Sequence, residues 1–297
     1  MQLINSCLFW ALPWWLGFVG CGPDPGHHIE KLKSMDSGIR TRAANALMRF
    51  DADEVVPLLL SESSSAYTRV RFEVVWLLGR FRDPRGVPVL IEALADRSPN
   101  VAARAALGLG LMRSVEALPY LLGYVRDPSE VTRQYILSAL GPCHSYVEAP
   151  ALSDSAHKVV LLALEETKPK WRVAALQSLR EFGYKDGFNS VLRMVEDPSA
   201  EVRHVAVQAL GQMASGKHFK AAGADPIVPL TVAQRESVIG VLLNAASVEE
   251  LQSIRTKAVR ALALVGDERA EYLIGQLAES GTAEDKIEAR RALGIMR

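Results

Sequence analysis

The 297-residue sequence has few cysteines and no excess of charge of either sign. Three cysteines, Cys7, Cys21 and Cys143, are too few for a disulfide framework. Lys plus Arg and Asp plus Glu number 34 each, which gives a formal net charge of zero. A general nucleic-acid binder needs a basic surface to displace phosphate counterions, and the chain contains no Lys/Arg-rich run. We therefore expect no nucleic-acid partner.

The first twenty residues, MQLINSCLFWALPWWLGFVG, contain no charged side chain. The apolar part has the length of a signal-peptide core and is short for a membrane span. It ends in FVGC at Cys21, followed by GPDPG, and this pattern resembles the lipobox of bacterial lipoproteins. The resemblance implies cleavage before Cys21, lipid attachment to that residue and a tether over residues 21–27. Two departures are Phe18, where Leu is usual, and the lack of Lys or Arg at the start.

The lipobox predicts a chain anchored by lipid to a bacterial membrane, on the periplasmic side of the cell envelope. Whether the inner or the outer membrane receives the anchor is left open. An uncleaved hydrophobic anchor, a signal cut at another small residue and a cytosolic chain remain alternatives. With Cys7 removed and Cys21 acylated, Cys143 would be the remaining thiol, so packing alone would hold the mature domain together.

A segment resembling DPSAEVRHVAVQALG, which begins at Asp197, recurs along most of the chain. Eight copies can be aligned, and five of the seven spacings between them are 31 residues. Each copy has leucine at one fixed position: Leu47, Leu78, Leu109, Leu140, Leu179, Leu210, Leu262 and Leu293. Seven of the eight copies have Arg or Lys seven residues before that leucine, and Ala102 is the exception. A fixed period of this size indicates a solenoid.

Each repeat contains two helical segments. In the second, apolar positions i, i+4, i+8 and often i+11 form one stripe, as in Val70, Val74, Leu78 and Phe81. The first carries a proline, and we expect Pro57, Pro88 and Pro119 in first helical turns. Asp96, Asp127 or Asp197 closes the first segment, and the turn supplies N-cap chemistry for the second. Each hairpin must stack on its neighbours to bury its stripes.

This pattern of proline, aspartate, basic residue, Ala and Leu resembles the HEAT-repeat family, especially the short repeats of phycobilisome lyases. The resemblance covers Gly26 to Arg297 and implies an all-α fold, an alpha-alpha superhelix of about eight hairpins. We expect the solenoid to occupy residues 28–297, with insertions near 143–156 and 212–232. In that family the second helices line the concave surface.

Positions on the second helices opposite the buried stripe give a neutral, amide-rich row with two aromatics near one end. Amides can hydrogen-bond an extended backbone, and Phe72 with Trp76 can anchor an apolar side chain. The predicted partner-binding residues are Phe72, Trp76, Arg104, Gln134, Tyr135, Gln177 and Gln208. An alternative is that Trp76 only packs on its neighbours.

The insertions contain further candidates. Residues Lys217, His218, Phe219 and Lys220 are predicted to contact a partner or lipid headgroups, unless they form a tolerated surface loop. Cys143 and His144 are adjacent, a spacing that rarely presents both side chains to one metal or substrate. Some HEAT-like hydroxylases bind iron through His-Glu pairs, but the HHIE stretch at His27 has no matching pair elsewhere. We expect no catalytic residue, metal or cofactor.

The sequence therefore predicts a protein that is not an enzyme but a lipid-tethered scaffold or adaptor. Its partner is predicted to be a protein, and an extended segment is one form that this partner could take. It contains no phosphate-binding glycine loop, nucleophile elbow or paired-carboxylate motif. The alternative is a HEAT-like enzyme, such as a lyase acting on a bilin-type chromophore. A structural spacer whose surface binds little is a third hypothesis.

Overall fold

The computed structural model describes residues 24–145, 147–216, 225–248 and 251–296. Helices fill most of these ranges, and no residue within them lies in a β-strand. The α-helices are α1 Pro25–Leu32, α2 Ser37–Leu47, α3 Ala52–Ser61, α4 Thr68–Phe81, α5 Val87–Glu92, α6 Pro99–Met112, α7 Leu118–Gly123, α8 Glu130–Cys143, α9 Pro150–Ala163, α10 Pro169–Glu181, α11 Phe188–Arg193, α12 Ala200–Ser215, α13 Val232–Val248, α14 Gln252–Val265, α15 Glu268–Ser280 and α16 Ala283–Met296. Short 3-10 turns lie at Pro84–Gly86, Ala93–Ala95, Val115–Ala117 and Met194–Glu196. The predicted all-α superhelix is confirmed.

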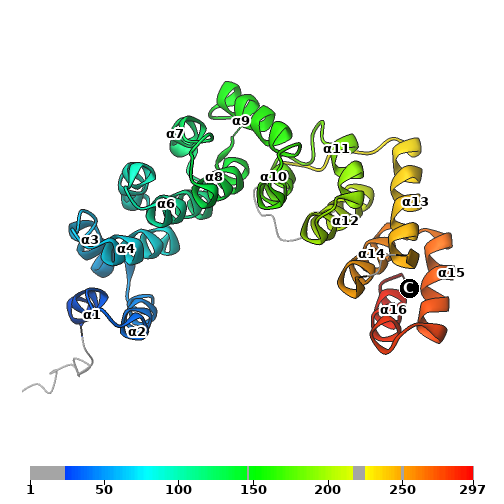
Figure 1. The fold of residues 1–297 in the computed structure, drawn as a ribbon, viewed down its shortest axis with the longest axis horizontal. Helices are drawn as coiled ribbons and strands as arrows, with labels where there is room; N and C mark the ends of the chain where they lie inside the picture. Colours follow the sequence, from blue (N-terminus) through cyan, green and yellow to red (C-terminus); the bar gives the residue numbers. More distant parts are fainter. Residues whose placement is uncertain (1–23, 146, 217–224, 249–250, 297) are drawn as a thin grey trace, which may run out of the picture.

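Figure 1 shows the helices arranged as an arc. The second helices α4, α6, α8, α10 and α12 lie along its inner side, while α3, α7, α9 and α11 lie along its outer side. Each second helix packs against the next, in a series that runs from α2 through α4 to α16. The inner surface of the arc is therefore built from the same helix of every repeat.

The repeated leucines form the core of the solenoid. Seven of the eight are fully buried, and the eighth, Leu293 on the terminal helix α16, is half-buried. The small or β-branched residue four positions earlier is buried in all eight copies, from Ala43 at 2% exposure to Ala289 at 0%. The register read from the repeat is therefore the register of the core.

Small residues set the spacing of the second helices. A Cβ added to Gly79 on α4 would lie 2.5 Å from the Cα of Gly108 on α6. Gly211 on α12 has the same relation to Ala261 on α14, where a Cβ would lie 2.5 Å from the alanine Cβ. Any larger side chain at these positions would separate neighbouring repeats.

Two prolines occupy the predicted position and one does not. Pro88 and Pro119 stand in the first turns of α5 and α7, where the missing N–H has no intrahelical partner. Pro57 lies inside α3, because that helix begins at Ala52, more than a turn earlier. The helix thus starts ahead of the proline instead of at it.

Helices extend into three of the predicted segments: the tether and both insertions. Helix α1 begins at Pro25, within the predicted tether 21–27, because the Asp24 side chain accepts a 2.7 Å hydrogen bond from the His27 N–H. Helix α9 occupies residues 150–156 of the first predicted insertion. Helix α12 continues to Ser215 and α13 begins at Val232, so both extend into the second insertion, 212–232. The predicted signal peptide and Cys21 lie outside the described residues.

Within the described ranges, none of the helices combines the length and the apolar character needed to cross a membrane.

Candidate functional site

A groove opens on the inner surface where α2, α4 and α6 meet. It has a volume of about 240 Å³, and its lining residues are Thr41, Ala44, Asn45, Phe72, Glu73, Trp76 and Arg104. Three of the predicted partner-binding residues, Phe72, Trp76 and Arg104, thus lie together. Phe72 and Trp76 are half-buried and pack against the core while each exposes part of its ring. These two side chains therefore both pack against the core and line the groove.

Two arginines lie over the aromatic rings of the groove. The Arg104 guanidinium carbon is 4.8 Å from the ring centroid of Phe72, and that of Arg80 is 5.7 Å from the ring of Trp76. Both distances suit cation–π attraction. The groove therefore presents aromatic surface and positive charge side by side.

Glu73 is the acidic residue of the groove wall. Burial raises the pKa of its carboxyl group, while the nearby cations Arg40 and Arg104 act in the opposite direction. The Arg40 Nε lies 3.5 Å from a Glu73 carboxylate oxygen. Arg40 thus compensates Glu73, and Arg80 and Arg104 supply the remaining charge beside the aromatic rings.

The other predicted residues do not join this groove. Gln134 and Tyr135 on α8, Gln177 on α10 and Gln208 on α12 are half-buried or exposed. Gln134 lines a separate cavity of about 490 Å³ at the amino-terminal ends of α8 and α10, where Trp171, Lys168 and Lys170 also lie. The predicted row is therefore a series of positions along successive helices, of which the first three form a pocket.

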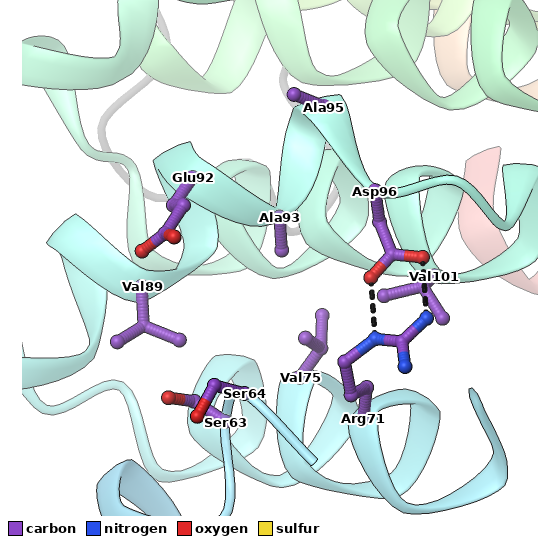
Figure 2. A pocket seen from close by; sticks show the side chains of 10 residues that line it. All are labelled: Ser63, Ser64, Arg71, Val75, Val89, Glu92, Ala93, Ala95, Asp96 and Val101. Atoms are coloured by element: carbon purple, nitrogen blue, oxygen red, sulfur yellow. Dashed lines mark hydrogen bonds and ion pairs between the residues drawn. The ribbon is translucent and has the colours of Figure 1, made fainter. Parts of the chain in front are cut away.

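A third cavity, of about 280 Å³, lies at the seam between the α4 and α6 repeats, and two of its charged side chains, Arg71 and Asp96, pair with each other (Figure 2). Arg71 donates from Nε and Nη2 to the two carboxylate oxygens of Asp96, at 2.7 and 3.0 Å. Its Nη1 also donates 2.8 Å to the carbonyl of Ser65. A bidentate pair of this kind, with side chains about one-tenth exposed, is a structural tie between neighbouring repeats.

The same ion pair recurs, and we name it the seam clasp: the arginine at the repeated basic position of a second helix, paired with the acid that ends the first helix of the following repeat. Arg172 donates to both oxygens of Asp197 at 2.8 and 2.7 Å. Arg133 donates to Glu166, 33 residues on instead of 25, because the eight-residue insertion lies between them. The repeated basic residue and the repeated acid were both visible in the sequence, but their pairing was not. A search for opposite charges 25 residues apart would have found it.

His144 in the first insertion and His157 directly after it are buried beside Phe182. The rings of His144 and His157 lie 4.2 and 5.0 Å from the Phe182 ring. Burial lowers the pKa of His157, whose Nε2 is 2.9 Å from the carbonyl of Lys185. Burial raises the pKa of Cys143 to about 12, so its thiol stays protonated and a poor nucleophile at neutral pH.

The end of the second insertion lies on the same cluster. The Asp225 N–H donates to the Glu181 carbonyl at 2.7 Å, and the Val228 N–H donates to the Gly183 carbonyl at 3.0 Å. An Asp225 carboxylate oxygen also lies 3.1 Å from Nε2 of His144. The predicted contact residues Lys217, His218, Phe219 and Lys220 lie outside the described residues.

Among the residues that the structure describes, no group of three or more His, Cys, Asp and Glu side chains is arranged to hold a metal ion. His27 is exposed, and His28 lies 5.9 Å, ring to ring, from Phe50. The HHIE stretch thus lies on the amino-terminal hairpin, and the described part of the chain gathers no set of metal ligands around it.

Comparisons with known proteins agree on the repeat. Residues 56–141 and 157–225 match the family described as HEAT repeats. The chain is 30% identical to deoxyhypusine hydroxylase of Rattus norvegicus over 172 residues, which are 51% of this chain and 56% of the relative. It is 34% identical to phycocyanobilin lyase subunit alpha of Synechococcus elongatus over 97 residues, 30% of this chain and 36% of the relative. The chain thus spans about half the length, or less, of these curated relatives.

Solved structures confirm the fold. The X-ray structure of the Escherichia coli protein YibA has a TM-score of 0.60 at 16% identity and covers 91% of each chain. An engineered protein has a TM-score of 0.54 at 19% identity and covers 93% of this chain and 79% of its own. At these identities the likeness concerns architecture alone.

The expectation that the chain is not an enzyme is contradicted by the curated relatives, because proteins named as a hydroxylase and a lyase are enzymes. The physical reason is that a repeat scaffold can bring catalytic side chains together from several hairpins. No local sequence motif then marks the site, so the lack of a motif excludes little.

Proposed function

Since the chain belongs to the HEAT-repeat family, we propose that it binds a protein partner on the inner surface of its arc, anchored at the groove of Phe72, Trp76 and Arg104. The observation that carries the proposal is the pair of half-buried aromatics beside a cavity on that surface. Aromatic and arginine side chains in a partly desolvated pocket are the residues that contribute most to protein–protein binding. A cavity of about 240 Å³ exceeds the 150 Å³ or so that holds a benzene molecule, so it has room for one apolar side chain.

An extended segment suits the rest of the surface. Gln177 and Gln208 repeat the same helix position on α10 and α12, and amides can bond to the backbone of a bound strand. Such contacts would add binding energy without selecting a sequence. The groove at α2–α6 would then supply the selective anchor.

We further propose that the chain is tethered by lipid on Cys21 to a bacterial membrane, on the periplasmic side. The FVGC sequence followed by GPDPG supports this proposal. Intact mass of the full-length protein purified from membranes tests it. A diacyl or triacyl adduct on a chain that begins at Cys21 is expected, and Cys21→Ser should release the protein from the membrane fraction. An unmodified chain that begins at Met1 would contradict the tether.

The binding proposal is tested by native mass measurement of the full-length tagged protein after gentle solubilisation. A stoichiometric second chain is expected, and Phe72→Ala/Trp76→Ala should lose it. The matched control is Tyr120→Ala/Leu162→Ala, which removes two exposed apolar side chains from helices of the outer side. If the control loses the partner as well, or the groove variant keeps it, the proposed surface is wrong.

A second candidate is an enzyme that acts on a bilin-type chromophore, and the similarity to phycocyanobilin lyase subunit alpha favours it. Absorbance in the visible range distinguishes the two proposals. A stable coloured adduct formed when a bilin is added to the purified protein would favour the lyase. No absorbance change, together with a stoichiometric protein partner, would favour the first proposal.

A further inference from the structure

We infer that the groove at α2–α6 recognises an acidic segment of an extended polypeptide, in which a carboxylate side chain flanks an aromatic or aliphatic one. The inference rests on the proposed binding function and names the chemistry of the partner. It follows from the balance of charge around the groove, from the geometry of the two arginines and from the contrast with the rest of the inner surface.

The groove carries more positive charge than its one acidic residue, Glu73, offsets. In the described part of the chain, Arg80 and Arg104 contact the rings of Trp76 and Phe72 and form no hydrogen bond or close ion pair with a carboxylate. Glu73, the acid of the groove wall, is met by Arg40 at 3.5 Å. Elsewhere on the inner side the exposed Arg260 is paired with Glu288. The arginines of the groove are therefore available to a ligand, whereas Arg260 on α14 is already paired with an acid.

The two arginines over the aromatic rings have a geometry that suits carboxylate binding. Arg104 is 4.8 Å over Phe72 and Arg80 is 5.7 Å over Trp76. A guanidinium over an aromatic ring keeps N–H donors free, in a planar fork that matches a carboxylate. A carboxylate bound to either arginine would place the next side chain of its segment close to the rings.

The apolar part of the ligand is set by the aromatic wall. Phe72 and Trp76 line the cavity from one helix, α4, four residues apart and therefore on one face. Because the rings are half-buried and rigidly packed, a side chain that contacts them displaces water without ordering the groove. An aromatic or aliphatic residue beside an acidic one satisfies both halves of the groove.

The remainder of the inner surface differs in charge. On later helices Gln134 occupies the repeat position of Phe72, and Gln177 and Gln208 occupy that of Trp76. The position of Arg104 is occupied by the uncharged Tyr135 on α8 and Val205 on α12. Burial and the nearby Lys257 lower the pKa of His204 on α12, which favours its neutral form at pH 7. An extended segment would thus meet cations at the amino-terminal end of the surface and neutral amides beyond it, so its acidic part would lie at the α2–α6 groove.

Fluorescence anisotropy with labelled synthetic peptides tests the inference on the full-length chain. The probe is a twelve-residue peptide with a central phenylalanine flanked by aspartates and glutamates, and its partner has the same sequence with asparagine and glutamine. We expect the acidic peptide to bind about tenfold more tightly at low salt, and the difference to shrink as salt rises. A third peptide with alanine in place of phenylalanine should lose affinity at every salt concentration.

Variants separate the charge from the aromatic surface. Arg80→Gln/Arg104→Gln should weaken the acidic peptide about tenfold and leave the neutral one unchanged. The matched control is Arg126→Gln/Arg290→Gln, two exposed arginines remote from the groove, which should change neither. A melting temperature close to that of the unaltered protein shows that each variant folds.

Three results would overturn the inference: equal binding of the acidic and neutral peptides, no binding of either at millimolar concentration, or tighter binding of a single-stranded oligothymidylate than of the acidic peptide. The proposed function is judged separately. If Phe72→Ala/Trp76→Ala loses the native partner while Arg80→Gln/Arg104→Gln keeps it, protein binding stands and the acidic selectivity is wrong.

Discussion

Two neighbouring seams of the solenoid have the same turn, but only one of them has an ion pair that links the two repeats in the described part of the chain. At the α4/α6 seam, Arg71 forms the seam clasp with Asp96. At the α6/α8 seam, the position of the arginine is occupied by Ala102, and Asp127 has no cation partner in the described part of the chain. Yet both aspartates accept a 2.8 Å hydrogen bond from the N–H two residues on, of Ser98 and Ser129. The aspartate alone therefore shapes the turn, and the arginine adds a tie between repeats.

The largest effect should come from the core that both seams share. Leu78 and Leu109 are fully buried on α4 and α6, so truncation to alanine removes methyl groups and leaves a cavity. We expect Leu78→Ala and Leu109→Ala each to lower the free energy of unfolding by about 2–5 kcal/mol. Urea unfolding measures it, and an unchanged midpoint for either variant would show that the assigned register is wrong.

A smaller loss should distinguish the clasped seam from the unclasped one. Asn can still accept the turn hydrogen bond, so Asp96→Asn breaks the clasp and keeps the turn, while Asp127→Asn changes little. We expect Asp96→Asn to cost about 1–3 kcal/mol more than Asp127→Asn, because it leaves the guanidinium of Arg71 without its charge partner. Equal unfolding midpoints for the two variants would show that the clasp adds no stability.

The clasp should also respond to pH. Burial alone would raise the pKa of Asp96, but hydrogen bonds from Arg71 and Ser98 outweigh it and hold the pKa below its ordinary value of 3.8. A depressed pKa in the folded state stabilises the fold above the unfolded value, and that stability is lost as pH falls through the folded value. The difference in unfolding free energy between the unaltered protein and Asp96→Asn should therefore be full at pH 6. It should shrink progressively below about pH 4.

Urea titrations at pH 6, 4 and 3 measure this difference. Asp127→Asn serves as the control for the other acids of the chain, since it removes a carboxylate from the same turn. A difference that stays constant down to pH 3 would mean that Arg71 does not favour the charged form of Asp96.

The sequence predicted the parts of this comparison that follow from periodicity. Hydrophobic positions repeat because each hairpin meets the same neighbours, so the buried leucines and the position of Ala102 as an exception could be read directly. The clasp was not predicted, although its charges recur 25 residues apart, because a spacing alone does not show where two side chains from different helices meet. The first residue of a helix was also not predicted in every repeat. Pro57 lies inside α3, because the position of a proline does not determine how many helical residues come before that proline.

For the site, the repeat identified the helix face but not which residues share a cavity. Phe72, Trp76 and Arg104 lie around one groove because α4 and α6 approach closely at Gly79 and Gly108. The glutamines on later helices occupy the same helix face, but they do not line the groove of Phe72, Trp76 and Arg104. The expectation that the chain is not an enzyme rested on the lack of a local catalytic motif, and the relatives named as enzymes contradict it.

The smallest effect should come from building the missing clasp. In Ala102→Arg, the new side chain would start where Arg71 and Arg172 start and could reach Asp127, 25 residues on. Arg203, at the same position on α12, bonds the carbonyl of Asp197 at 3.0 Å, so the carbonyl of Asp96 is the expected second acceptor. Ala102 is 3% exposed, and crowding offsets part of the gain. We expect a rise of about 0.5–1 kcal/mol in the free energy of unfolding, abolished by adding Asp127→Asn. If Ala102→Arg destabilises the protein to the same extent with and without Asp127→Asn, the seam has no room for the arginine, and close packing of α6 explains why this repeat departs from the others.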